Sequence, residues 1–113
     1  MGYQALVIPD HLMGQLSPVV AMTAIATATR TLRVGAFVLN NDLRHPAVLA
    51  QDLAAIDVVS QGRLDIAIGA GWNKPEYDAI GLPFDRTPVR QARLAEAEEV
   101  HRILRALTDG FRL

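Results

Sequence analysis

Three short runs of aliphatic side chains recur along the chain, and each is bounded by residues typical of turns. The runs cover residues 5–9, 32–39 and 63–70. They are apolar throughout rather than alternating, which is typical of strands buried on both faces of a parallel sheet. About 30 residues separate successive runs, the usual length of a βαβ crossover. The pattern therefore predicts three parallel strands.

Each run is followed by a segment with helical signals, in which proline stands where the first turn is expected, at positions 18, 46 and 88. In two of these segments a potential capping hydroxyl, Ser17 or Thr87, precedes the proline. The last segment carries an apolar stripe and a charged opposite face, which predicts an outer, half-exposed helix. Residues 73–86 are expected to form a long loop, because Pro75, Gly81 and Pro83 interrupt them.

Alternating strands and helices predict an α/β fold with right-handed crossovers and a parallel sheet. This pattern is compatible with either an open or a closed sheet. If the three helices cover one side, as in a barrel, the other apolar face of the sheet stays exposed. The chain is then a small open sandwich, a part of something larger, or a self-associating protein, and we favour the last two.

Length and composition narrow the class of protein further. The 113 residues, half of them hydrophobic and a fifth charged, fit one ordinary domain over residues 1–113. A net charge of −1 offers no electrostatic basis for binding nucleic acid or anionic membranes. The chain has no cysteine, so we expect no disulfide. Its three histidines are scattered, with no two of them four residues apart, so we expect no metal site. It shows no secretory signal and no membrane-spanning run, so we expect a cytoplasmic protein.

Polar residues follow all three predicted strands, in the segments 9–11, 40–42 and 69–72. Because ligands of parallel α/β folds bind at the carboxyl ends of strands, these segments are expected to share one rim. There His11 is either a general acid or base or a turn residue facing solvent. Asp10 either orients His11 or bonds a cofactor, or is an ordinary turn residue, and Asn40 is either a donor to a ring or a loop residue.

The third run ends in Gly69, Ala70, Gly71 and Trp72, which leaves the nature of the ligand open. A dinucleotide fingerprint needs a third glycine where this chain has Lys74, and it needs a helix at once, so a phosphate loop is disfavoured. Glycines that admit a flat ring to the backbone fit better. Trp72 either stacks on such a ring or plugs the loop onto the sheet. Glu76 and Tyr77, further along, either reach the site from a lid or anchor the loop.

The stretches GYQALVIPDH and LRVGAFVLNNDLRHPAVLAQDLAAIDVVSQGRLDIAIGAGWNKPEYDAIGLPF resemble the luciferase-like monooxygenase superfamily. They are most similar to its coenzyme F420-dependent oxidoreductases, and the run from Gly35 to Phe84 is the most specific part. The resemblance implies a (β/α)₈ TIM-type barrel of which this chain matches strands two to four, that is, three βα units. It also implies an oxidoreductase that transfers hydride between a small-molecule substrate and F420, or alternatively FMN.

The resemblance implies roles for particular positions. The pair Asp10–His11 matches the end of the second barrel strand, where relatives keep an acid–base histidine. Phe37–Val38 matches a non-prolyl cis peptide that bulges behind the cofactor ring, and 69–71 matches the backbone lining that ring. Some relatives place a glutamate where this chain has Trp72, so either the chemistry differs or another residue supplies the proton.

Two hypotheses of different classes follow for the whole chain. The first is a flavin- or F420-dependent oxidoreductase present as a part of its barrel, in which the cofactor carries the redox chemistry. The alternative is a non-catalytic barrel fragment, a homo-oligomer that hides its open sheet face and binds cofactor weakly or not at all. A small flavodoxin-like domain is a weaker third possibility, because it needs helices on both faces of the sheet.

Overall fold

The computed structural model describes residues 2–108 and shows a three-stranded parallel sheet with the order β1-β2-β3. The strands are β1 (Ala5–Ile8), β2 (Arg33–Asn40) and β3 (Leu64–Gly69). They lie within two residues of the predicted runs, because each run of branched aliphatics is closed by turn residues. The α/β prediction and the parallel sheet are confirmed.

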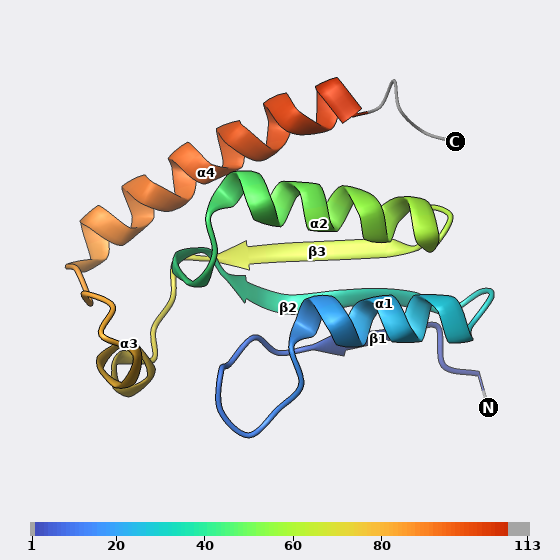
Figure 1. Cartoon of the computed structure of the whole chain (residues 1–113), viewed down its shortest axis with the longest axis horizontal. Coiled ribbons are helices and arrows are strands. Elements are labelled where there is room, and N and C mark those ends of the chain that lie inside the picture. Colours follow the sequence, from blue (N-terminus) through green and yellow to red (C-terminus); the bar gives the residue numbers. More distant parts are fainter. Residues whose placement is uncertain (1, 109–113) are drawn as a thin grey trace.

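Helices follow each of the three strands (Figure 1). They are α1 (Pro18–Ala28), α2 (Pro46–Val59), α3 (Lys74–Ile80) and α4 (Thr87–Thr108), and a short 3₁₀ turn, η1 (Asn41–Leu43), precedes α2. Ser17 makes no side-chain capping bond, whereas the ring nitrogen Nδ1 of His45 accepts from the backbone of Ala47 at the start of α2. The expected serine cap was therefore wrong, and a histidine takes that role in the next helix.

The helix α3 corrects the expected long loop after β3. Pro75 lies in the first turn of α3, where its missing N–H is not needed, and Gly81 ends the helix with a positive φ of 72°. The same residues that suggested an uninterrupted loop are thus the start and stop signals of a short helix. In Figure 1, α3 lies beyond the carboxyl ends of β2 and β3.

The core forms between β2 and the helices α1 and α2, all on one face of the sheet. It contains fully buried Val34 and Leu39 from β2, with Met22 from α1 and Leu49 from α2. The opposite face of the sheet is not covered by any described element, and Val7 and Phe37 are 57% and 72% exposed. The one-sided helical layer expected for a barrel wall is what the structure shows.

An irregularity in β2 changes which side chains face the core. Ala36 pairs with Ile66 and Leu39 with Ile68, so Phe37 and Val38 together oppose a single residue of β3. The peptide bond between Phe37 and Val38 is cis, as the family resemblance predicts. Both side chains therefore reach the uncovered side of the sheet while Leu39 returns to the core.

Within residues 2–108 no helix combines the length and the apolar character that crossing a membrane would require.

Candidate functional site

A pocket of about 210 Å³ lies at the carboxyl ends of the three strands, where the sequence places its polar segments. Its walls come from all three segments and from the start of α3, and consist of Pro9, Asp10, His11, Phe37, Val38, Asn40, Gly71, Trp72, Asn73 and Glu76. The structure therefore brings together most of the predicted site residues. Gly69 and Ala70 were predicted with them but do not line the pocket.

His11 is half-buried and contacts the pocket residues on two sides. Its Nδ1 lies 3.2 Å from Oε2 of Glu76, whose side chain is only 4% exposed. The imidazole also meets the indole of Trp72 edge to face, with ring centroids 5.7 Å apart. Among the described residues, no group forms a hydrogen bond with Nε2 of His11, so this nitrogen is free to meet a ligand.

Asp10 adjoins His11 in sequence, but its carboxylate bonds other residues. Its carboxylate forms a two-pronged ion pair with Arg44, at 2.5 and 2.9 Å, and also accepts from the backbone N–H of Asn40 at 2.9 Å. The side chain is fully buried. Asp10 therefore does not have the orienting role toward His11 that the sequence had suggested. It instead joins the end of β1 to the end of β2 and to the segment before α2.

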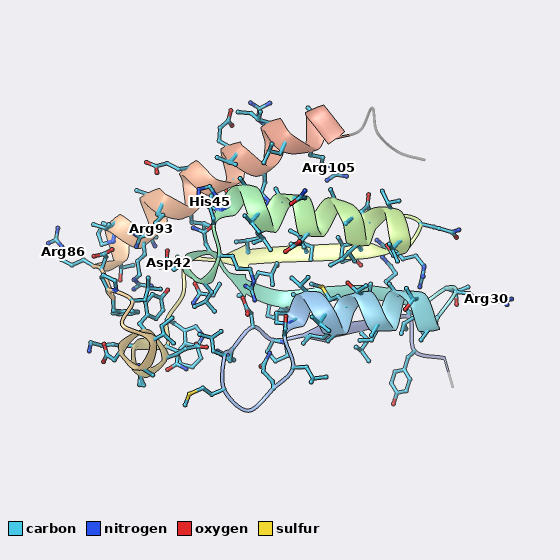
Figure 2. All side chains as sticks on the ribbon, viewed as in Figure 1. Arg30, Asp42, His45, Arg86, Arg93 and Arg105 are labelled. Atoms are coloured by element: carbon cyan, nitrogen blue, oxygen red, sulfur yellow. The ribbon has the colours of Figure 1, made fainter. Side chains whose placement is uncertain are left out.

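A buried polar network holds the floor of the pocket. Tyr77 is fully buried, and its hydroxyl donates to Asp42 at 2.8 Å and lies 3.2 Å from Oδ1 of Asn40. Burial, reinforced by the hydrogen bond to Asp42, raises the pKa of Tyr77 to about 12, so the phenol stays a neutral donor. Arg93 of α4 pairs with the other oxygen of Asp42 at 2.7 Å, and Figure 2 shows the two side chains at this end of the molecule.

An arginine of α4 forms hydrogen bonds with backbone carbonyls of the loop after β3. Arg90 is buried, stacks on the Phe84 ring at 4.3 Å, and donates to the carbonyls of Ala70, Gly71 and Asp85. Ala70 therefore serves the site through its backbone rather than as a wall of the pocket.

Glu76 lines the pocket, although the sequence leaves it open as either a lid residue or an anchor of the loop. Its two oxygens bond His11 and the backbone N–H of Leu12, so α3 is fastened to the segment after β1. In the sequence, Glu76 is recognisable only as an acidic residue shortly after the glycine turn. The structure shows that α3 brings its carboxylate to His11. Imidazole, carboxylate and exposed aromatic walls together form a site that can bind a flat ring and move a proton beside it.

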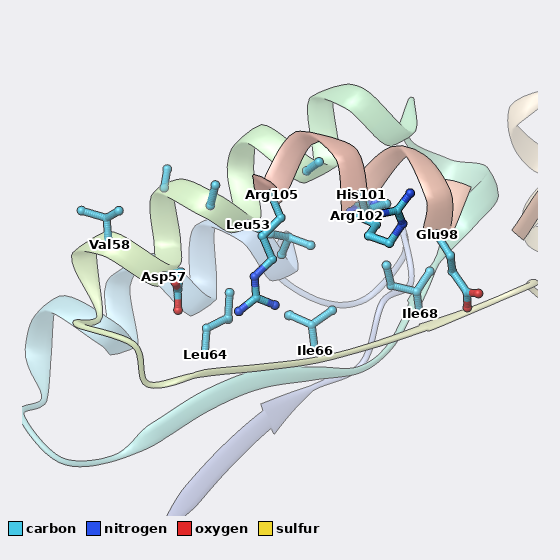
Figure 3. A pocket seen from close by; sticks show the side chains of 13 residues that line it. Leu53, Asp57, Val58, Leu64, Ile66, Ile68, Glu98, His101, Arg102 and Arg105 are labelled. Atoms are coloured by element: carbon cyan, nitrogen blue, oxygen red, sulfur yellow. The ribbon is translucent and has the colours of Figure 1, made fainter. Parts of the chain in front are cut away.

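A second, larger cavity of about 610 Å³ lies on the helical side of the sheet, between α2, β3 and α4 (Figure 3). Leu64, Ile66 and Ile68 project into it from β3, and His101 enters from α4. His101 is half-buried, and burial lowers the pKa of its imidazole. None of its lining residues lies at the carboxyl-end pocket, so the cavity is separate from the candidate site.

The fold and the position of the pocket define an α/β protein with a parallel sheet and a candidate site at the carboxyl ends of its strands. The chain belongs to the luciferase-like monooxygenase family, which matches it over residues 1–112. One relative, the 5,10-methylenetetrahydromethanopterin reductase of Methanopyrus kandleri, is 34% identical over 83 residues. That match covers 74% of this chain and 23% of the reductase.

Solved structures agree with this assignment. An F420-dependent secondary alcohol dehydrogenase in complex with an F420–acetone adduct superposes with a TM-score of 0.82 at 27% identity, covering 91% of this chain and 33% of that one. The FMN-bound oxygenating constituent of 3,6-diketocamphane monooxygenase from Pseudomonas putida shares the fold, with a TM-score of 0.75 at 20% identity over 87% of this chain and 28% of that one. This chain thus spans about a third or less of these relatives' length.

Proposed function

We propose that this chain forms the ring-binding part of an F420-dependent oxidoreductase, with His11 as the group that exchanges a proton beside the cofactor. The observation that carries the proposal is the pocket itself, where a free imidazole nitrogen adjoins exposed aromatic and aliphatic walls. The coenzyme F420-dependent tetrahydromethanopterin reductase of Methanopyrus kandleri and the F420-dependent alcohol dehydrogenase, both similar in structure to this chain, support F420. FMN is the alternative, supported by the FMN-bound monooxygenase of the same fold.

The residues present fit a flat heteroaromatic ring. Phe37 is 72% exposed and Trp72 71% exposed, so two aromatic surfaces of the pocket wall lack full cover. Such surfaces stabilise a planar ligand by stacking or edge contacts, while polar groups of the wall can meet its heteroatoms. Bound in the pocket, F420 would supply the hydride chemistry.

In this proposal each part of the chain has a distinct task. The Phe37–Val38 segment supports the ring from the sheet, and Gly71 lets the turn before Trp72 pack closely against Tyr77 and Asn40 at the edge of the pocket. His11 gives or takes a proton through Nε2, because Nδ1 is the nitrogen that faces Glu76. The small-molecule substrate would bind on the uncovered side of the ring.

The test is a fluorescence titration of F420 with the purified chain, followed by competition with FMN. We expect saturable F420 binding that FMN does not displace. Phe37→Ser should weaken binding about two- to tenfold, the loss expected for one aromatic contact. The matched control is Tyr3→Ser, which removes an aromatic side chain that is 85% exposed and lies outside the pocket.

Two results would contradict the proposal in different ways. Displacement of F420 by equimolar FMN would make the site a flavin site of the same family. Absence of binding by either compound would favour the second candidate, a non-catalytic part of a barrel. The observation that favours this second candidate is the uncovered apolar face of the sheet.

A further inference from the structure

The contact between His11 and Glu76 joins two segments that lie 65 residues apart in sequence. Oε2 of Glu76 faces Nδ1 of His11 at 3.2 Å, and Oε1 accepts from the backbone N–H of Leu12. Both carboxylate oxygens are therefore engaged by consecutive residues of one segment. These two hydrogen bonds fix the orientation of the carboxylate, so that Oε2 is the oxygen that faces the imidazole.

An ionised carboxylate only accepts hydrogen bonds, so the ring nitrogen that faces it must carry a hydrogen. Glu76 therefore favours the form of neutral His11 with hydrogen on Nδ1 and a lone pair on Nε2. The edge-to-face contact with Trp72 further limits rotation of the imidazole. Because Nε2 has no hydrogen-bond partner among the described residues, its lone pair is available to the pocket.

Within residues 2–108, the acid next to His11 in sequence and the other acid on α3 are both engaged elsewhere. The carboxylate of Asp10 accepts three hydrogen bonds from Arg44 and Asn40 and is fully buried, so its oxygens are already used. Asp78 lies on the same helix as Glu76, but it is exposed and pairs with Lys74 at 2.8 Å. Glu76 is the acid that the fold brings to the imidazole.

We infer that Glu76 is a positioning residue that holds His11 with hydrogen on Nδ1, so that Nε2 is the atom that exchanges a proton with a ligand in the pocket. In that exchange the Nε2 lone pair forms a new N–H bond as the O–H or N–H bond of the ligand breaks. The positive charge left on the imidazolium is balanced by the adjacent carboxylate of Glu76. The inference rests on the proposed role of His11 as the proton-exchanging group.

The test is nitrogen NMR of the ¹⁵N-labelled chain, without cofactor, at a pH at which His11 is neutral. Replacing His11 identifies its signals among those of the three histidines. In the wild type, Nδ1 should resonate as a protonated nitrogen and Nε2 as an unprotonated one. The result that would overturn the inference is the reverse assignment in the wild type.

The variant Glu76→Gln keeps the shape of the side chain but has only one acceptor oxygen. The backbone N–H of Leu12 always donates and takes that oxygen, so the amide NH₂ faces Nδ1 and His11 should shift its hydrogen to Nε2. The matched control, Asp78→Asn, makes the same chemical change on the same helix and should leave His11 as in the wild type. An unchanged His11 in folded Glu76→Gln would also contradict the inference.

These outcomes are separable from those of the proposed function. The position of the hydrogen on His11 is measured without F420, so failure to bind F420 leaves this result intact. If Glu76→Gln does not fold, the wild-type spectrum still decides between the two nitrogens. A merely structural Glu76 would have no reason to move hydrogen from one ring nitrogen to the other.

Discussion

Gly71 lies where backbone conformation and packing both exclude a side chain. Its φ is 86°, in the left-handed region that residues with a Cβ rarely adopt. A Cβ built at this position would also collide with the hydroxyl of Tyr77 and lie 2.9 Å from Oδ1 of Asn40. The sequence suggested that this glycine lets a flat ring approach the backbone. The structure shows that it is needed because Tyr77 and Asn40 leave no room for a side chain.

Gly71→Ala is therefore expected to destabilise the fold by more than about 3 kcal/mol, because strain from positive φ adds to overpacking. The matched control is Gly81→Ala, where φ is also positive but no atom lies within 4 Å of the new Cβ. It should cost about 1–2 kcal/mol, from backbone strain alone. Urea unfolding of both variants measures the difference, and equal losses would show that the contacts with Tyr77 and Asn40 are unimportant.

At the scale of elements, two arginines form hydrogen bonds between helices and loops that the β-sheet hydrogen bonds do not connect. Arg63 donates to the carbonyls of Ala26, Thr29, Leu32 and Ser60 and so joins the carboxyl ends of α1 and α2 at the amino end of β3. At the opposite end, Arg90 fastens the loop after β3 to the start of α4. The planar guanidinium reaches several carbonyls at once, which a lysine ammonium cannot do in the same geometry.

Arg90→Lys should consequently lower the free energy of unfolding by about 2 kcal/mol, the size of lost hydrogen bonds to a charged group. Arg86→Lys is the matched control, since Arg86 is exposed near the start of the same helix (Figure 2). We expect that substitution to be nearly neutral. Denaturant titration of the two variants checks the comparison, and an equally small loss for Arg90→Lys would mean that the loop is held by other contacts.

The whole molecule is a one-sided sheet, and this shape carries the prediction of self-association. The strands β1 and β3 are the two edges of the sheet, and neither has a second neighbour in the described chain. Val7 and Phe37 are exposed on the uncovered face. A second copy can supply parallel strands and apolar side chains of the same kind, whereas unpaired edges and apolar patches are unfavourable in a monomer.

We therefore expect the chain to sediment at a mass above the 12.3 kDa of one copy. Val7→Lys should reduce this association, because it places a charge on the uncovered face of an edge strand. Val20→Lys is the matched control, at a side chain of α1 that is 65% exposed and lies on the helical side. Sedimentation of the wild type as a single chain would refute the prediction.

The sequence by itself determined the strands, the main helices and the end of the sheet at which a site would form. It did so because branched aliphatic runs, prolines at first turns and glycines are local signals that act over a few residues. The family resemblance likewise follows from a contiguous stretch, and it includes the cis peptide at Phe37–Val38. Most residues of the pocket wall were therefore foreseeable.

Only the tertiary structure decided which side chains become partners. It turned Asp10 toward Arg44, brought Glu76 to His11 and made Pro75 the start of a helix rather than the middle of a loop. These pairings join residues more than 30 positions apart, or depend on a helix only seven residues long. Hydrophobic periodicity records which face of an element is buried, whereas a hydrogen bond between distant side chains depends on distances that exist only once the chain is folded.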